Sequence, residues 1–493
     1  MPSIVNTNIN SLTAQRQLSS SQNALSTSMA RLSSGLRINT AKDDAAGLNI
    51  SERFTSQIRG LNQAVRNTSD GISLAQTAEG ALGSVNGILQ RVRELAVQSA
   101  NATNSSSDRL SLNNEVGQLT SELDRIAQAT QFNGQNLFDG SFGAAVYQVG
   151  ANVNQTITAA SVNVRTAAYG NNQVAGTNAG VSSGTAGGFG TNGITAGTLA
   201  VSGFAGSANV TVALSDTAAA IATSINAQKG STGVSATAQT DVSVSFQSVG
   251  NYSFNIASTT STTSTVNFNV SAIATADGLS NAAAAINDQT SKTGVVAVVN
   301  ALGTALTLSN SNGADIVLSK TATQIQAGSV TSQKLNANGT TVAGTAALTT
   351  TASVQNAITS GYLTLDSEKS FGVTATTTNA LATSTSSLNT VAAIDVSTIA
   401  GANQAIKTTD SALSLVNGQR AKFGALQSRF EATINNLSVS SENLSASRSR
   451  IQDADFATET ASLSRAQILQ QAGTAMVAQA NQLPQGVLAL LRG

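Results

Sequence analysis

The sequence predicts a multi-domain α+β protein in which both chain ends form one α-helical coiled-coil bundle and the middle forms inserted β-rich domains. Near the N-terminus, Leu18, Leu25 and Leu32 recur every seven residues. A longer series with the same period lies near the C-terminus: Val416, Phe423, Phe430, Leu437, Leu444 and Ile451. Such a repeat marks a helix whose apolar stripe is buried against another helix. Two distant segments that each need a helical partner most simply use each other.

Composition narrows the function classes. Charged residues are 10% of the 493 residues and the formal net charge is zero, so neither nucleic acid nor an anionic membrane is an expected partner. The apolar runs are far too short for membrane insertion. The chain has no histidine and no cysteine, which excludes Ser-His-Asp and Cys-His catalysis and the usual zinc, haem and iron–sulfur ligands. We therefore expect neither an enzyme nor a cofactor, with only a carboxylate site for calcium or magnesium left open.

Apolar spacing of three and four places the helices at both ends. A polar turn at 101–107 ends the second helix, and Ser107 or Asp108 is expected to cap the third. The turn signals Phe132-Asn133-Gly134 and Phe138-Asp139-Gly140 then predict hairpins within 132–165. The expected helices are 4–34, 45–100, one starting near 108, 402–451 and 457–491, with a polar linker over 36–45.

The centre has a different composition. Arg165 is the last arginine before Arg420, and the residues between are β-branched and punctuated by glycine, which predicts short strands and turns. One repeat occurs with a period of 61: Ile225-Asn226 and Thr232-Gly233-Val234 recur as Ile286-Asn287 and Thr293-Gly294-Val295. It predicts two copies of a small α+β unit, with helical pieces at 217–227 and 280–288. Residues 335–395 are either a related unit or loops, and the glycine-rich run 184–191 is a loop.

The outermost helices carry more apolar surface than one hairpin of the two chain ends can bury. Exposed apolar patches imply association, so these helices are expected to pack between subunits. The residues that need a further partner include Ile4, Val5, Ile9, Leu483, Leu488, Leu490 and Leu491. Carboxylates at 43, 44, 453 and 455 are expected to cap backbone rather than bind cations.

Six segments resemble the bacterial flagellin family. In chain order they are RLSSGLRINTAKDDAAG (31–47), QRVRELAVQ (90–98), QFNG (131–134), QVGAN (148–152), SRSRIQDAD (447–455) and the closing LLRG (490–493). The resemblance covers about 1–165 and 400–493, in one order. The 61-residue repeats resemble a small motif inserted in many flagellin and hook-associated proteins.

The resemblance implies a structural polymer rather than an enzyme. Residues 1–43 and 453–493 would form D0, the inner tube of a filament, 44–172 and 399–452 would form the rod-like D1, and 173–398 would form outward D2/D3 domains. Subunit packing in D0 is expected to involve Val5, Ile9, Leu12, Leu18, Leu25, Leu32, Leu483, Val487, Leu488, Leu490 and Leu491. The D1 coiled-coil core is expected to comprise Val416, Phe423, Phe430, Leu437, Leu444 and Ile451.

The resemblance also implies partners and a location. The first residues, MPSIVNTNINSLTAQRQ, lack the pattern of a Sec signal peptide, so export unfolded through the flagellar type III apparatus is expected. A chaperone would hold the C-terminal helix before export, and hook–filament junction and cap proteins would contact the extracellular filament. The residues matching the family's Toll-like receptor epitope are Arg91, Leu95 and Glu115. Leu488, Leu490 and Leu491 match the end sensed by NAIP receptors.

Other interpretations stay open at this point. A hook–filament junction protein shares helical ends, although the 31–47 segment and the LLRG end favour flagellin. The zinc peptidase that some flagellins carry needs histidine, which this chain lacks. An adhesive role or O-glycosylation of the Ser/Thr-rich centre is compatible with the main interpretation. The sequence does not indicate the organism or the hand of the filament.

Overall fold

The computed structural model describes residues 7–176, 182–185, 191–258, 263–300, 302–321, 323–337, 339–350 and 355–491, without the side chains of 182–185, 343–344 and 483–491. Its internal contacts divide the chain into two units. Unit 1 comprises Met1–Glu79, Gly143–Ala160 and Lys422–Gly493, and unit 2 comprises Gly80–Phe142 and Ser161–Ala421. The five domain boundaries expected from the sequence stay predictions.

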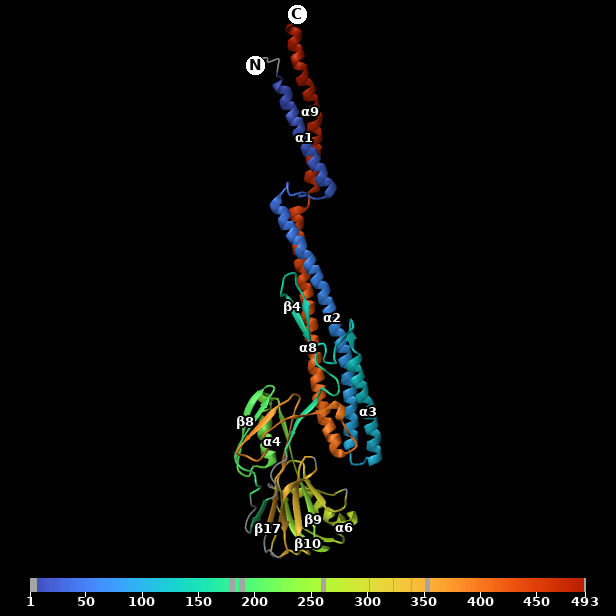
Figure 1. Ribbon diagram of the computed structural model, residues 1–493, viewed down its shortest axis with the longest axis vertical. Coiled ribbons are helices and arrows are strands. Elements are labelled where there is room, and N and C mark those ends of the chain that lie inside the picture. The colour runs from blue at the N-terminus through green and yellow to red at the C-terminus, as the bar shows by residue number, and fades with distance from the viewer. Residues whose placement is uncertain are drawn as a thin grey trace. The chain divides into compact units, whose positions relative to one another are not determined.

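The predicted fold class is confirmed, with long helices from both chain ends and a β-rich centre (Figure 1). The helices are α1 (Ile9–Ser34), α2 (Ala45–Ala100), α3 (Ser106–Ala129), α4 (Ala218–Ala227), α5 (Lys229–Thr232), α6 (Ala276–Asn287), α7 (Thr290–Thr293), the short 3-10 helix η1 (Val391–Ala393), α8 (Ile399–Gln452) and α9 (Phe456–Leu491). The strands are β1 (Gln131–Phe132), β2 (Gln135–Asn136), β3 (Ala144–Gln148), β4 (Thr156–Ala160), β5 (Gly170–Ala175), β6 (Ser182–Thr185), β7 (Gly197–Gly203), β8 (Gly206–Val212), β9 (Ser235–Phe246), β10 (Gly250–Ser258), β11 (Ser264–Val270), β12 (Val296–Val299), β13 (Leu306–Asn310), β14 (Ile316–Lys320), β15 (Val330–Leu335), β16 (Thr341–Leu348), β17 (Gln355–Thr359), β18 (Tyr362–Ser367), β19 (Gly372–Thr376), β20 (Ser384–Thr385) and β21 (Ser387–Thr390).

In unit 1, the two terminal helices lie side by side, as the sequence predicts (Figure 1). Asn8 caps α1 by accepting a hydrogen bond from the Ser11 backbone N–H at 3.1 Å. Its side-chain Nδ2 also donates to the Ala480 carbonyl at 2.8 Å. The helix ends at Gly35, whose φ of 73° is the left-handed conformation that glycine adopts at low cost. The expected helical residues 4–6 lie outside the described residues.

The segments that join α1 to α2 and α8 to α9 are held together by backbone. Leu36 and Asp453 form an antiparallel bridge, and the Ala454 N–H donates to the Gly35 carbonyl at 2.9 Å. Ile38, in the linker expected to be polar, is 1% exposed. These contacts hold the linker between α1 and α2 against the linker between α8 and α9.

Three of the four carboxylates in these linkers, those of Asp43, Asp44 and Asp455, cap backbone as expected. Asp43 Oδ2 accepts from the Thr40 N–H at 2.9 Å, and Asp44 Oδ1 accepts from the Gly47 N–H at 2.8 Å. Asp455 Oδ1 likewise accepts from the Ala457 N–H at 2.9 Å. Hydrogen bonds from the Thr40 N–H to Asp43, and from the Thr458 hydroxyl and then backbone N–H groups to Asp455, hold the pKa values of both carboxyls below their usual range.

Helices α2 and α8 pack through the seven-residue series. In unit 1, Phe430 is fully buried and meets Tyr147 edge to face at 5.6 Å, while Leu437 packs on Leu61 and Ala64. Phe423 is also buried, whereas Leu444 and Ile451 are half-buried. In unit 2, a second core joins α2, α3 and α8 through Val92, Leu95, Ala96, Val116, Ala402 and Ala405.

Two local predictions in unit 2 need correction. The cap of α3 is Ser105, not Ser107 or Asp108, and Asp108 instead closes a capping box by accepting from the Ser105 N–H at 2.9 Å. The turn at Asn133-Gly134 does close a two-residue hairpin between β1 and β2, with both residues at positive φ. The turn at Phe138-Asp139-Gly140 forms no hairpin, and Asp139 Oδ1 instead accepts from the Ser141 N–H at 2.9 Å.

The centre of unit 2 contains antiparallel sheets over two buried cores. The strand orders are β11-β10-β14-β17-β6, β12-β13-β9-β18-β5-β21 with β15 and β16 attached at β9, and β20-β19-β7-β8. One core includes Phe254 and Phe268, whose rings meet edge to face at 5.6 Å. The other packs Ile221 of α4 against Leu199 and Leu365.

The period of 61 is a structural repeat. Asn226 donates to the Ala236 carbonyl at 2.8 Å and accepts from the Ala236 N–H at 2.8 Å. Asn287 makes the same pair with Ala297, at 2.9 and 2.7 Å. Helix α6 starts earlier than residue 280, because Thr275 caps it by accepting from the Gly278 N–H. Much of 335–395 is strand rather than loop, since β16 to β21 lie there.

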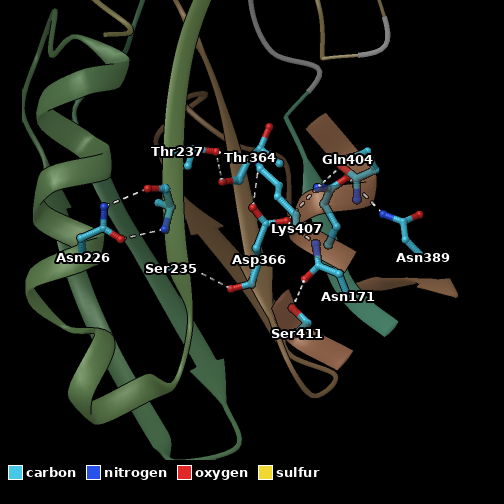
Figure 2. A network of polar contacts seen from close by, with 12 residues as sticks. Asn171, Asn226, Ser235, Thr237, Thr364, Asp366, Asn389, Gln404, Lys407 and Ser411 are labelled. Carbon is cyan, nitrogen blue, oxygen red and sulfur yellow. Dashed lines mark hydrogen bonds and ion pairs between the residues drawn. The ribbon is translucent and has the colours of Figure 1, made fainter. Parts of the chain in front are cut away.

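A polar network joins α8 to the sheet within unit 2 (Figure 2). The Asp366 carboxylate of β18 accepts hydrogen bonds from Asn171 at 2.6 Å and Gln173 at 2.7 Å, both on β5. Lys407 of α8 donates to it at 2.9 Å and to Thr237 Oγ1 at 3.1 Å. Helix and sheet are therefore linked by an ion pair whose carboxylate is mostly buried.

Candidate subunit interface

The seam between α1 and α9 contains several small residues beside half-buried leucines of α1. Ala466, Gly473 and Ala480 are spaced by seven, and the two alanines are buried. A Cβ added at Gly473 would lie 3.2 Å from Leu18 Cδ1, so the two helices approach closely at this glycine. On α1, the buried residues of the seam are Ser11 and Ser28. The contact within the chain thus combines small residues with partly buried leucines.

Large apolar side chains of the same two helices are exposed to solvent. Each of the following is more than half exposed, and we refer to them as the outer apolar residues: Ile9, Leu12, Met29, Phe456, Ile468, Leu469 and Met476. Scattered single apolar residues are normal on a protein surface. Several exposed apolar residues on one helix pair, next to small residues such as alanine, glycine and serine, form a surface that is available for further packing.

The residues expected to pack in D0 fall into three groups. Leu18, Leu25 and Leu32 are half-buried in the helix pair, whereas Ile9 and Leu12 are exposed. Val5 lies outside the described residues. The side chains that are not described are those of Leu483, Val487, Leu488, Leu490 and Leu491. Sequence reasoning missed Phe456, Ile468, Leu469 and Met476, although the spacing of 468, 469 and 476 is that of one helical face.

The residues expected to face a Toll-like receptor lie in unit 2. Arg91 reaches the Glu115 carboxylate through Nη2 at 2.9 Å and Nε at 3.1 Å, and also contacts Glu94 at 3.1 Å. The hydrogen bonds to Glu115 and Glu94 raise the pKa of Arg91. Leu95 differs from this pair because it is 1% exposed and belongs to the core of α2, α3 and α8. The place of Leu95 in a receptor epitope stays a prediction, and in the monomer its side chain is buried.

Comparison with known proteins identifies the family. The bacterial flagellin N-terminal helical region matches residues 5–143, the C-terminal helical region matches 406–491, and the flagellin hook IN motif matches 198–250. The B-type flagellin of Pseudomonas aeruginosa is 42% identical over 99% of both chains. The chain belongs to the bacterial flagellins. The flagellin of Salmonella typhimurium is 36% identical over 100% of both chains.

Family membership gives the general function. Flagellins are structural proteins and not enzymes, and this flagellin is a self-associating subunit of the extracellular flagellar filament. The hook IN motif spans β7 to β9 and includes the first structural repeat with Asn226. A solved hook associated protein-3 from Legionella pneumophila is 13% identical, covers 81% of this chain and 98% of its own, and has a TM-score of 0.34, too low to support an argument.

Among the residues that the structure describes, no three His, Cys, Asp or Glu side chains gather closely enough to hold a metal ion. In that same part of the chain, none of the helices combines the length and apolar character that crossing a membrane requires.

Proposed function

We propose that this flagellin joins the filament by burying the outer apolar residues of α1 and α9 against the same helix pair of neighbouring subunits. The observation that carries the proposal is the division of these helices into a seam of small residues and an exposed set of large apolar ones. Burying one large apolar side chain contributes about 1.5–3 kcal/mol. Several such side chains per subunit would therefore supply a substantial driving force.

The proposed contact is heterologous, meaning that unlike faces of the two subunits meet. A heterologous contact that does not close a ring continues without limit, as a filament requires. The half-buried Leu18, Leu25 and Leu32 would support the pair from within. The seven-residue series from Val416 to Ile451 would hold the rod inside each subunit, since its residues are buried or half-buried there.

The test compares two single substitutions on α9. Ile468→Ser removes an exposed apolar side chain, whereas Gln471→Ser changes an exposed polar one by a similar size. The critical concentration for polymerisation should rise at least tenfold for Ile468→Ser and stay at the wild-type value for Gln471→Ser. Both monomers should melt like wild type because neither side chain is buried. Equal critical concentrations for the two variants would refute the proposal.

The same outer residues support the proposed export partner. Before assembly, the apolar side chains of α9 need protection from water, and a flagellar export chaperone at the C-terminal helix would provide it during type III export. Binding of the purified chaperone to the full chain should weaken when Ile468, Leu469 and Met476 are changed together to serine. Unchanged affinity would contradict this role. Hook–filament junction and cap proteins would meet the same helices at the two ends of the filament.

Host recognition is a second proposed function, favoured by the exposed ion pair between Arg91 and Glu115. Both side chains are about half exposed, at 50% and 45%, so a Toll-like receptor could contact them without any change in the fold. Arg91→Ala and Glu115→Ala should each lower receptor-reporter stimulation by monomer. Leu95→Ala serves as a separate variant because it creates a core cavity. A wild-type response from the Arg91→Ala, Glu115→Ala double variant would eliminate this epitope.

Recognition of the C-terminal end by NAIP receptors rests on the resemblance at Leu488, Leu490 and Leu491. Changing all three to alanine should abolish cytosolic sensing. A matched change of the exposed Gln467 and Gln471 of α9 to alanine should leave it intact.

A further inference from the structure

Two of the three methionines of the chain are exposed on the terminal helices. Met29 of α1 is 53% exposed and Met476 of α9 is 63% exposed, whereas Met1 lies outside the described residues. Methionine is among the residues that folded proteins bury most often. Both described methionines therefore occupy unusual positions, and both belong to the outer apolar residues.

The methionine sulfurs are the groups of this chain that oxidants attack most readily. The chain contains no cysteine, histidine or tryptophan, and its four tyrosines are buried or half-buried. A peroxide transfers one oxygen atom to a thioether. The sulfur lone pair forms the S–O bond, the O–O bond breaks, and the second oxygen takes up the proton of the first and leaves as water. Because flagellin works outside the cell, it meets the oxidising environment in which such reagents persist.

Met476 shares one face of α9 with two further outer apolar residues. Ile468 and Leu469 precede it by eight and seven residues, which is the spacing of a single helical stripe. Both are more than half exposed. A sulfoxide at position 476 would therefore place a strongly polar S=O group within an apolar stripe.

The two methionines lie at different heights of the helix pair. Gly473, three residues before the methionine of α9, lies beside Leu18. Arg31, two residues after the methionine of α1, pairs with Glu459 at 3.7 Å. The helices therefore run antiparallel, and the two methionines are about 20 Å apart along the pair at a rise of roughly 1.5 Å per residue. One oxidised molecule can carry polar groups at two separate points of its apolar surface.

We propose that Met29 and Met476 are sulfoxidation sites at which an extracellular peroxide makes the free subunit unable to assemble. This proposal rests on the proposed burial of the outer apolar residues. A thioether adds apolar surface to that contact, whereas a sulfoxide is polar and costs free energy when it is buried without hydrogen-bond partners. Methionine sulfoxide reductases reverse the modification, so assembly follows the oxidation state of two sulfurs. Within a filament, the contact covers both sulfurs and shields them from peroxide.

Peptide mass spectrometry after hydrogen peroxide treatment tests the sites. In free monomer, the peptides that contain Met29 and Met476 should each gain the mass of one oxygen atom. In filaments, the same peptides should gain it at least ten times more slowly. Unmodified sulfurs in the monomer, or equal rates in monomer and filament, would overturn the proposal.

The critical concentration for polymerisation tests the consequence. Peroxide treatment of wild-type monomer should raise it at least tenfold, and subsequent treatment with methionine sulfoxide reductases should restore it. The oxidised monomer should melt like the untreated one, because both side chains are exposed. Doubly oxidised monomer that polymerises like untreated monomer would contradict the proposal.

A Met29→Leu, Met476→Leu double variant is the matched control. Leucine is close to methionine in volume and takes up no oxygen, so this variant should polymerise like wild type both before and after peroxide treatment. Met1 remains in the variant, so its resistance to peroxide would assign the effect to positions 29 and 476. A peroxide effect of wild-type size in the double variant would place the sensitive group elsewhere and refute the assignment.

Ile468→Ser separates this proposal from the one on which it rests. If Ile468→Ser impairs assembly and the two sulfoxides do not, the sulfoxidation proposal is wrong and burial of the outer apolar residues stands. If the sulfoxides impair assembly and Ile468→Ser does not, the sulfoxidation sites stand and the proposed contact is wrong. If neither change impairs assembly, both proposals fail.

Discussion

The ring of Phe430 occupies the space that a side chain at Gly71 would need. A Cβ built on Gly71 would lie 2.7 Å from Phe430 Cζ and 2.8 Å from Cε2. Phe430 is fully buried and packs against Val149, Ile157 and Tyr147. The ring is therefore enclosed on several sides and cannot move away without disturbing the hairpin.

Gly71→Ala should accordingly destabilise unit 1. Overpacking of a well-filled core costs about 1–3 kcal/mol, which outweighs the roughly 1 kcal/mol that alanine gains over glycine inside a helix. Gly83→Ala on the same helix is the control, because nothing lies within 4 Å of a Cβ there. Urea unfolding should show a lower midpoint for Gly71→Ala and a slightly higher one for Gly83→Ala. A stabilised Gly71→Ala would show that the ring relocates freely.

Asn226 and Asn287 should be equivalent in energy as well as geometry. Each asparagine side chain forms hydrogen bonds with both the N–H and the carbonyl of one strand residue, Ala236 or Ala297. Leaving these partly buried backbone groups without a hydrogen-bond partner costs about 1–3 kcal/mol. Asn→Ala at either position should lower the unfolding free energy by this amount, and Asn→Asp should do so too because a carboxylate cannot donate. The changes are measured by thermal melting. A loss at one position alone would show that the repeat is not energetically symmetric.

The buried pair Asp315 and Lys334 should give the centre of unit 2 an unusual pH dependence. Burial raises the pKa of Asp315 from 3.8 to about 6, and burial lowers the pKa of Lys334 from 10.5 to about 8 despite the attraction of Asp315. A raised carboxyl pKa favours folding below pH 3.8, and this contribution is lost as pH rises through about 6. The lysine's contribution is present above pH 10.5 and is lost as pH falls through about 8.

Asp315→Asn tests the low-pH part of this dependence of the unfolding free energy. Asparagine can still accept from Asn192 Nδ2, which donates to Asp315 Oδ2 at 2.8 Å, but it does not titrate. The difference in unfolding free energy between wild type and Asp315→Asn should shift against wild type by about 1–3 kcal/mol between pH 4 and 6. If the unfolding free energies of wild type and Asp315→Asn change with pH in the same way across that range, the carboxyl keeps an ordinary pKa.

The link between Lys407 and Asp366 should be worth more than an exposed ion pair. Lys407→Met leaves the carboxylate, whose side chain is 13% exposed, without its cation, and a loss of about 1–3 kcal/mol is expected. Arg93→Met is the control: the Arg93–Asp410 pair is 45% and 50% exposed, so less than about 1 kcal/mol should be lost. Thermal melting measures both. Adding Asp366→Asn to Lys407→Met should recover part of the loss, and no recovery would argue against the ion pair.

Sequence reasoning succeeded where one face of an element is buried. The seven-residue series predicted α8 because the same stripe repeats from Val416 to Ile451, over most of the helix. The sequence did not predict the strands within 335–395. Strands β17 and β18 are buried on both faces, so apolar and polar residues do not alternate along them. The sequence did not reveal that α6 starts before residue 280, because threonine and glycine at 275 and 278 are also typical of a turn.

The sequence predicted the packing surface of α1 and α9 only in part. Ala466, Gly473 and Ala480 form the seam of α9, but small residues give no hydrophobic contrast that a pattern could detect. The sequence therefore assigned the large residues of the terminal helices to packing without separating those inside the helix pair from those outside. Leu95 was placed in an epitope by resemblance, whereas its burial depends on α3 and α8, which the local sequence does not reveal.

The small-residue seam between α1 and α9 has a thermodynamic consequence. Since the chain keeps several bulky side chains exposed on this pair, growth of the proposed polymer must dehydrate apolar surface. Dehydration of that kind lowers the heat capacity and is driven by entropy near room temperature. Its strength fades on cooling. Filaments built in this way should shed subunits in the cold, and calorimetry of assembly should record a negative heat-capacity change that shrinks when Ile468 and Met476 are made polar.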